Sequence, residues 1–239
     1  YVSASGSSGT LAAGDYLKDK YQTKIAVVEA LECPTLLHGG YGEHNIQGIG
    51  DKHVPLIHNV MNTDFVVDVS DQATNNLNMI FNTDIGRKFL IEQKNFDPTF
   101  VARLPEFGFS AIANIIASIK LAKYMDLNSD DAIITVATDG ADLYMSELNK
   151  TINDFKNNFD EIVCAELYGK HLSGLSTDNM LELSQIDKKR IFNLGYFTWV
   201  EQQGISLEDF EKRKNQDFWN SHYNYMLSLD NQIKEFNNM

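Results

Sequence analysis

Short apolar runs alternate with helical apolar spacing over roughly the first 140 residues. Four runs have the length and composition of buried strands: residues 1–5, 24–29, 65–69 and 132–137. Apolar residues three and four positions apart predict helices at 11–21, 72–82, around 89–90 and from 111 onward, with a break over 103–110. Asp71 is the expected cap of the second helix. Strands that alternate with helices imply an α/β fold with a mostly parallel sheet covered on both faces.

The pattern changes near residue 151. Beyond it, charged amphipathic helices are predicted near residues 153–168, 176–194 and 206–220. We therefore expect an α/β domain over residues 1–151 and an α-helical extension over 152–239. Aromatic residues of the extension, such as Trp199 and Trp219, are expected to pack against the sheet domain or a partner chain.

Composition narrows the class of protein. The chain has 239 residues, 43% of them hydrophobic, and a formal net charge of -13, which opposes binding to nucleic acid or anionic membranes. Two cysteines are too few for a disulfide framework, and no apolar run has the length of a membrane span, so a reducing, cytoplasmic setting is expected. Tyr1 is not a methionine and opens a predicted core strand, which suggests a fragment boundary.

Two glycine-rich segments are candidates for ligand binding. Gly6-Ser7-Ser8-Gly9-Thr10 lies between a predicted strand and a predicted helix, where glycines allow close approach and a helix N-terminus favours an anion. An ordinary loop with a helix cap is the alternative. Residues 39–50 hold five glycines after a predicted strand, at the sheet edge where α/β proteins bind ligands. A flexible surface loop is the alternative there.

Together these segments resemble a known family. Residues 6–10 and the following helix resemble the Gly-Thr-Gly-Gly-Thr phosphate loop and helix of cysteine synthases, which are fold type II pyridoxal-phosphate enzymes. Residues 42–50, Gly-Glu-His-Asn-Ile-Gln-Gly-Ile-Gly, resemble that family's Gly-Pro-His-Lys-Ile-Gln-Gly-Ile-Gly loop, in the same order along the chain. Gly108-Phe109-Ser110-Ala111 resembles its Gly-Ile-Ser-Ser segment. The resemblance covers about residues 1–150 and implies the large-domain part of the tryptophan synthase beta-like fold, in a cysteine synthase-like branch rather than among the synthases themselves.

The resemblance also implies a cofactor and a site. The cofactor would be pyridoxal 5′-phosphate, its phosphate held by Gly6, Ser7, Ser8, Gly9 and Thr10. Ser110 would face the pyridine nitrogen, and a neutral serine there suits β-elimination or β-replacement on an amino-acid substrate. The second loop would lie beside the ring and the substrate through His44, Gln47, Gly48, Ile49 and Gly50. A homodimer is expected.

The departures from the family matter as much. In this fold the Schiff-base lysine and the loop that binds the substrate carboxylate belong to the half that precedes the phosphate loop, and Lys18, Lys20 and Lys52 do not have the lysine's sequence position. The resemblance thus implies that this chain is inactive by itself and needs the N-terminal half of the same enzyme or a complementary chain. Glu43 replaces the family's proline, so the family's substrate cannot be assigned to this chain.

Two other functions remain as alternatives. One is a non-catalytic module that keeps the fold for phosphate binding or assembly. The other is a nucleotide-binding α/β domain, which the lack of a Walker lysine and of a full dinucleotide fingerprint disfavours. No metal is expected, because the histidines at positions 38, 44, 53 and 58 fit no compact metal motif.

Overall fold

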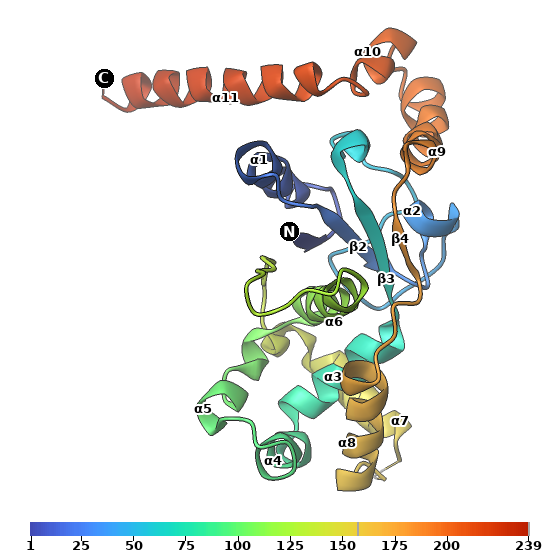
Figure 1. Ribbon diagram of the computed structural model, residues 1–239, viewed down its shortest axis with the longest axis vertical. Coiled ribbons are helices and arrows are strands. Elements are labelled where there is room, and N and C mark those ends of the chain that lie inside the picture. Colours follow the sequence, from blue (N-terminus) through green and yellow to red (C-terminus); the bar gives the residue numbers. More distant parts are fainter. Residues whose placement is uncertain (157, 239) are drawn as a thin grey trace.

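A four-stranded sheet forms the centre of the computed structural model, which describes residues 1–156 and 158–238. The strands are β1 (Val2–Ala4), β2 (Ala26–Ala30), β3 (Phe65–Val69) and β4 (Met180–Glu182), in that spatial order. β1, β2 and β3 are parallel, and β4 runs antiparallel to β3 (Figure 1). The predicted α/β fold with a mostly parallel sheet and flanking helices is confirmed.

Helices connect and cover these strands. The α-helices are α1 (Leu11–Tyr21), α2 (Thr35–His38), α3 (Asp71–Asn82), α4 (Asp84–Glu92), α5 (Pro98–Val101), α6 (Phe109–Tyr124), α7 (Met145–Asp154), α8 (Glu161–Tyr168), α9 (Gln185–Tyr196), α10 (Leu207–Lys212) and α11 (Gln216–Asn237). Short 3-10 turns are η1 (Val60–Asn62), η2 (Leu104–Glu106) and η3 (Ala141–Tyr144), and π-helical turns are η4 (Gly169–Ser173) and η5 (Phe197–Gln202).

The sheet is buried on both faces, which explains why β2 and β3 read as continuous apolar runs. Val28 and Val67 point into a core formed with α3, α4, α6 and α8, where Ile112 is fully buried. Their neighbours Val27 and Val66 point to the opposite face, into a second core formed with α1, α9 and α10. α6 crosses the first face in Figure 1, and α9 lies on the side of the sheet where β4 joins.

Several predicted elements match closely. The helix at 11–21 and the strand at 65–69 have the predicted bounds. The cap of α3 is different: the Ser70 hydroxyl, not Asp71, accepts a hydrogen bond from the N–H of Ala73. Asp71 instead accepts hydrogen bonds from the N–H groups of Asn45 and Ile46, so it fixes the glycine-rich loop.

The predicted strand at 132–137 is wrong, because the segment forms only a single bridge, between Thr135 and Val2. The N–H of Val2 donates to the carbonyl of Ile134 at 2.9 Å. The next ladder bond is replaced by a side chain: Asn114 Oδ1 accepts from the N–H of Ala4 at 2.7 Å, and Asn114 Nδ2 donates to the carbonyl of Val136 at 2.9 Å. The inserted amide holds the two backbones apart, and pairing stops there.

The C-terminal part is also not purely helical. The helix predicted over 176–194 is wrong in its first half, which contains β4, while α9 occupies the second half. The helix predicted over 153–168 is divided between α7 and α8, and that over 206–220 between α10 and the start of α11. The division of the chain at residues 151 and 152 stays a proposal.

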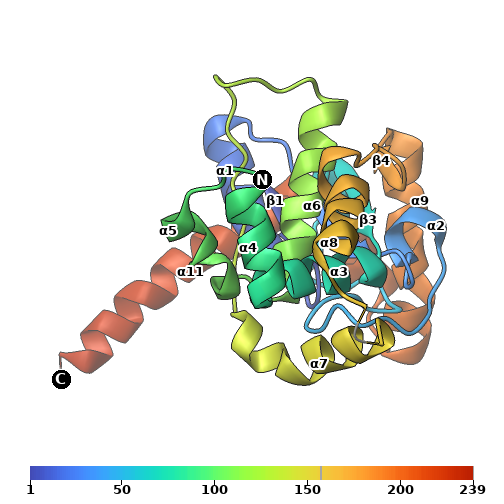
Figure 2. The ribbon, with the colours of Figure 1, turned by 90° about the horizontal axis from the view of Figure 1, so that it is seen from below.

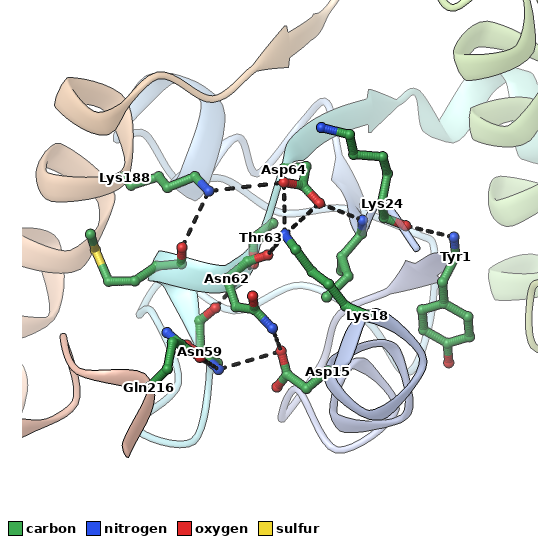
Figure 3. A network of polar contacts seen from close by, with 12 residues as sticks. Tyr1, Asp15, Lys18, Lys24, Asn59, Asn62, Thr63, Asp64, Lys188 and Gln216 are labelled. Carbon is green, nitrogen blue, oxygen red and sulfur yellow. Dashed lines mark hydrogen bonds and ion pairs between the residues drawn. The ribbon is translucent and has the colours of Figure 1, made fainter. Parts of the chain in front are cut away.

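A polar network at the beginning of β3 ties the C-terminal helices to the sheet (Figure 3). The Asp64 carboxylate accepts hydrogen bonds from Lys18 Nζ and from the N–H of Ile25, each at 2.8 Å, and lies 4.0 Å from Lys188 Nζ of α9. Asn59 exchanges hydrogen bonds with Gln216, the first residue of α11. Within the described ranges, no helix combines the length and the apolarity that crossing a membrane requires.

Candidate functional site

A cavity of about 290 Å³ lies at the carboxyl end of β1. The loop between β1 and α1, part of the glycine-rich loop and the first turns of α6 surround it. Its lining residues are Ser3, Ala4, Gly6, Ser7, Ser8, Gly9, Thr10, Gly48, Ile49, Ser110, Asn114, Val136 and Thr138. The structure therefore brings together four segments, within residues 3–10, 48–49, 110–114 and 136–138, that the sequence separates by more than 20 residues each.

The loop before α1 has free hydrogen-bond donors. Among the residues that the structure describes, no protein group accepts a hydrogen bond from the backbone N–H groups of Ser7, Ser8, Gly9 or Thr10. All four residues line the cavity, directly before the first turn of α1. Unpaired N–H groups at a helix N-terminus, with the positive end of its dipole, form a binding site for an anion.

The hydroxyl groups of this loop are mostly engaged with the protein. Thr10 Oγ1 accepts a hydrogen bond from Ser3 Oγ at 2.8 Å and donates to the carbonyl of Ala4. The Ser8 hydroxyl pairs with that of Ser5, and the backbone of Ser8 has a positive φ of 69°. These bonds fix the shape of the loop, so the donors left for an anion are mainly backbone N–H groups.

The two glycine-rich loops lie in direct backbone contact. The N–H of Gly50 donates to the carbonyl of Ser5 at 2.6 Å. A Cβ atom on Gly6 would lie 2.8 Å from the carbonyl oxygen of Gly48, and both Gly48 and Gly50 have a φ of +77°. Side chains at these positions would push the loops apart or strain the backbone, which explains why glycine is required here.

Ser110 lies across the cavity, in the first turn of α6. Its Oγ is 3.3 Å from Thr138 Oγ1, which donates in turn to the Asp139 carboxylate. The Tyr144 hydroxyl donates to the same carboxylate, and burial together with this hydrogen bond raises the pKa of Tyr144 to about 12. Gly108 leaves room for the carboxylate, since a Cβ there would lie 2.6 Å from Asp139 Oδ1. A line of polar groups thus orients the Ser110 hydroxyl.

Three of the expected loop residues are not among those lining the cavity. Gln47 is exposed. The His44 ring packs on Gly50, where an added Cβ would lie 2.5 Å from its Nε2, and its buried Nδ1 has no hydrogen-bond partner in the described part of the chain. Conversely, Ser3 and Asn114 line the cavity although the motifs did not indicate them. The only signal for Asn114 was a polar residue within the apolar run of α6.

A buried carboxyl pair lies nearby without lining the cavity. Glu29 and Asp68 face each other on β2 and β3, and both are almost completely buried. Glu29 accepts hydrogen bonds from the N–H groups of Leu36 and Leu37, whereas neither carboxyl oxygen of Asp68 has a hydrogen-bond partner among the described residues. Burial and the neighbouring Glu29 raise the pKa of Asp68 to about 9, so the pair holds a proton at neutral pH.

Unpaired N–H groups at the carboxyl end of a parallel strand, with Ser110 on a facing helix across the cavity, are the arrangement expected from the motifs that resemble the fold type II class. Cysteine synthase B of Campylobacter jejuni is 31% identical over 148 residues, which are 61% of this chain and 42% of that protein. This identity confirms the resemblance to the cysteine synthase-like family. Cysteine synthases are pyridoxal-phosphate enzymes, so the similarity supports the expected cofactor. The chain spans less than half the length of this curated relative, and no family model matches it.

Two solved structures are similar in part. The hydrogen sulfide-producing enzyme of Fusobacterium nucleatum is 23% identical, with 76% of this chain and 47% of that chain covered and a TM-score of 0.49. A variant of that enzyme is 20% identical, with 77% and 45% covered and a TM-score of 0.46.

Proposed function

We propose that this chain is the cofactor-binding part of a pyridoxal-phosphate-dependent lyase or synthase that performs β-elimination or β-replacement on an amino acid. The observation that carries the proposal is the cavity at the start of α1, where four consecutive residues, 7–10, have backbone N–H groups without a protein acceptor. The similarity to cysteine synthase supports the same conclusion.

The lining residues fit the phosphate of pyridoxal 5′-phosphate. Its oxygens accept hydrogen bonds, and residues 7–10 offer donors at a helix N-terminus. Neither lysine nor arginine lines the cavity within the described residues, so the N–H groups and the helix dipole would hold the phosphate. Because Gly6 has no side chain, the carbonyl of Gly48 in the second loop can lie against it, and the second loop covers this end of the cavity.

Ser110 and Ile49 would act on the ring. When bound, pyridoxal phosphate supplies an electron sink for negative charge that develops on the substrate. A neutral hydroxyl at Ser110 does not stabilise a protonated pyridine nitrogen as a carboxylate would, which suits elimination and replacement at the β-carbon. Thr138 and Asp139 would orient this hydroxyl. Gly48 and the buried Ile49 would cover the ring and exclude water, beside the substrate.

A second segment is required for catalysis. No lysine contributes to the lining of this cavity within residues 1–156 and 158–238, so a lysine that binds the cofactor covalently would come from elsewhere. We infer that the N-terminal half of the same enzyme, or a complementary chain, supplies this lysine and the substrate-carboxylate loop. The isolated chain would then bind cofactor without turnover. Cys33 and Cys164 are buried free thiols, which suits a cytoplasmic enzyme.

The absence of a lysine from the described cavity lining also favours the second candidate, a non-catalytic module that binds a phosphorylated ligand. One experiment separates the two functions. The complete protein is purified from its source with saturating pyridoxal phosphate, its absorbance at the boundary of the visible and ultraviolet ranges is recorded, and candidate amino acids are added. The lyase or synthase proposal expects cofactor absorbance and turnover. Bound cofactor without turnover of any amino acid would favour the non-catalytic module. A protein free of cofactor would refute the lyase or synthase proposal and also the assignment of pyridoxal phosphate as the ligand.

A further inference from the structure

The last helix, α11, is exposed along most of its length although one side of it is apolar. Figures 1 and 2 show it leaving the body of the molecule, with its C-terminal end far from the sheet. Met226 and Ile233 are each 55% exposed, and Phe236 is 72% exposed. Exposed apolar side chains along one side of a projecting helix indicate a surface that another molecule covers.

The apolar residues of α11 have a symmetric spacing. Met226 is the centre of the pattern. Trp219 and Tyr223 lie 7 and 3 residues before it, and Leu229 and Ile233 lie 3 and 7 residues after it. At about 3.6 residues per turn, all five fall within about 60° of Met226 around the helix axis. We call these five residues the α11 stripe. When two such helices run antiparallel, with a two-fold axis through Met226, each apolar residue of one stripe lies opposite an apolar residue of the other.

The body of the protein completes the surface. α1 and the first half of α11 enclose a groove of about 460 Å³, in which Tyr16 of α1 lies against Tyr223 with ring centroids 5.9 Å apart. Trp219 belongs to this groove, whereas Ile233 lies beyond it. The same two-fold axis brings the Ile233 of a second copy opposite Trp219, so that each copy would fill the groove of the other.

We propose that the α11 stripe binds a second copy of this chain through an antiparallel helix pair. Charge favours this arrangement over a parallel one. Within the same arc of the helix, the acidic and basic side chains are Asp230 and His222, which lie 4 residues after and 4 residues before Met226. Antiparallel pairing brings Asp230 of one copy opposite His222 of the other, whereas parallel pairing brings the two Asp230 carboxylates together. In a chain with a net charge of -13, an interface with few charges also limits repulsion.

This inference does not rest on the proposed function, because among the described residues none of α11 lines the cavity at the carboxyl end of β1. Disulfide trapping tests the orientation. Met226→Cys lies on the two-fold axis and is expected to give a disulfide-linked dimer under mild oxidation. In Ile233→Cys the two introduced thiols would be 14 helical positions apart, about 21 Å along the axis, which is too far for a bond. The native Cys33 and Cys164 are buried, so the unsubstituted chain, oxidised in the same way, gives the background level of cross-linking.

Sedimentation of the full chain over a range of concentrations tests the interface itself. The chain is expected to dimerise, and Met226→Glu to raise the dimer dissociation constant at least about tenfold, because two carboxylates would then face each other in an apolar seam. Ser228→Glu is the matched control, since it adds the same charge two positions away on the opposite side of the helix, and its dissociation constant is expected to stay unchanged. Circular dichroism of each variant checks that the helices are retained.

Three results would overturn the proposal. Equal cross-linking of Met226→Cys and Ile233→Cys would indicate a parallel pair. A dimer that Met226→Glu does not weaken would use another surface. A chain that stays monomeric at every concentration and does not cross-link would show that the α11 stripe does not bind a second copy.

Discussion

Substitution of Gly6 by alanine tests the contact between the two glycine-rich loops. A Cβ on Gly6 would lie 2.8 Å from the carbonyl oxygen of Gly48. The Cβ position is fixed by the backbone at residue 6 and the carbonyl is part of the backbone at Gly48, so neither can rotate away, and one loop has to move by several tenths of an ångström. Gly9→Ala is the matched control, because Gly9 is in the same loop and its added Cβ would meet only Ser7 Oγ, at 3.8 Å.

The expected magnitude follows from comparing these two variants. Extra atoms forced into a well-packed site typically cost about 1–3 kcal/mol. Replacing glycine by alanine also restricts the unfolded chain, which favours folding by about 0.4–1 kcal/mol, but this effect is present in both variants and cancels in their difference. Gly6→Ala is therefore expected to unfold with a free energy about 1–3 kcal/mol lower than Gly9→Ala.

Urea unfolding followed by circular dichroism measures this difference, provided that the slopes of the two transitions agree. A weaker attachment between the loops should also speed hydrogen exchange at the N–H of Gly50, which donates to the carbonyl of Ser5. Equal unfolding free energies for the two variants would refute the claim that the loops are locked by close backbone approach at Gly6.

Two further substitutions test the packing and the buried charges. Gly86→Ala would place a Cβ 2.1 Å from the carbonyl oxygen of Ile80, so it is expected to destabilise the α3–α4 connection more than Gly6→Ala does, as measured by urea unfolding; equal stability to the native chain would contradict this. Asp68, whose pKa is raised to about 9, contributes most to stability below the ordinary carboxyl pKa, and this contribution should fall as the pH rises toward 9. Asp68→Asn should flatten that decline and exceed the native chain in stability at pH 8, whereas an unchanged pH slope would contradict the buried proton.

The parts of the fold that the sequence predicted well are those with local signals. β2 and β3 are apolar at nearly every position because both faces of the sheet are covered, and α1 follows from apolar spacing after a glycine loop. The meeting of residues 6–10, Gly48, Ile49 and Ser110 was predictable from the order of motifs in a resembled family, not from periodicity.

The errors come from interactions between distant residues. The segment at 132–137 has the composition of a strand, but Asn114 inserts its amide between Ala4 and Val136, and nothing in the segment itself signals this. β4 is only three residues long and partly exposed, so its pairing with β3 depends on the rest of the fold rather than on an apolar pattern. The position of His44 against Gly50 likewise depends on the folded loop.

Binding of 4′-deoxypyridoxine 5′-phosphate to the full chain tests the central claim most directly. This analogue keeps the ring and the phosphate but has no aldehyde, so it cannot react with surface lysines, and phosphorus NMR follows its phosphate. We predict saturable binding that inorganic phosphate competes with, perturbed amide signals for residues 7–10 and Ser110, and no comparable binding of the unphosphorylated analogue. Failure to bind, or equal binding with and without the phosphate, would contradict the assignment of residues 6–10 as a phosphate site.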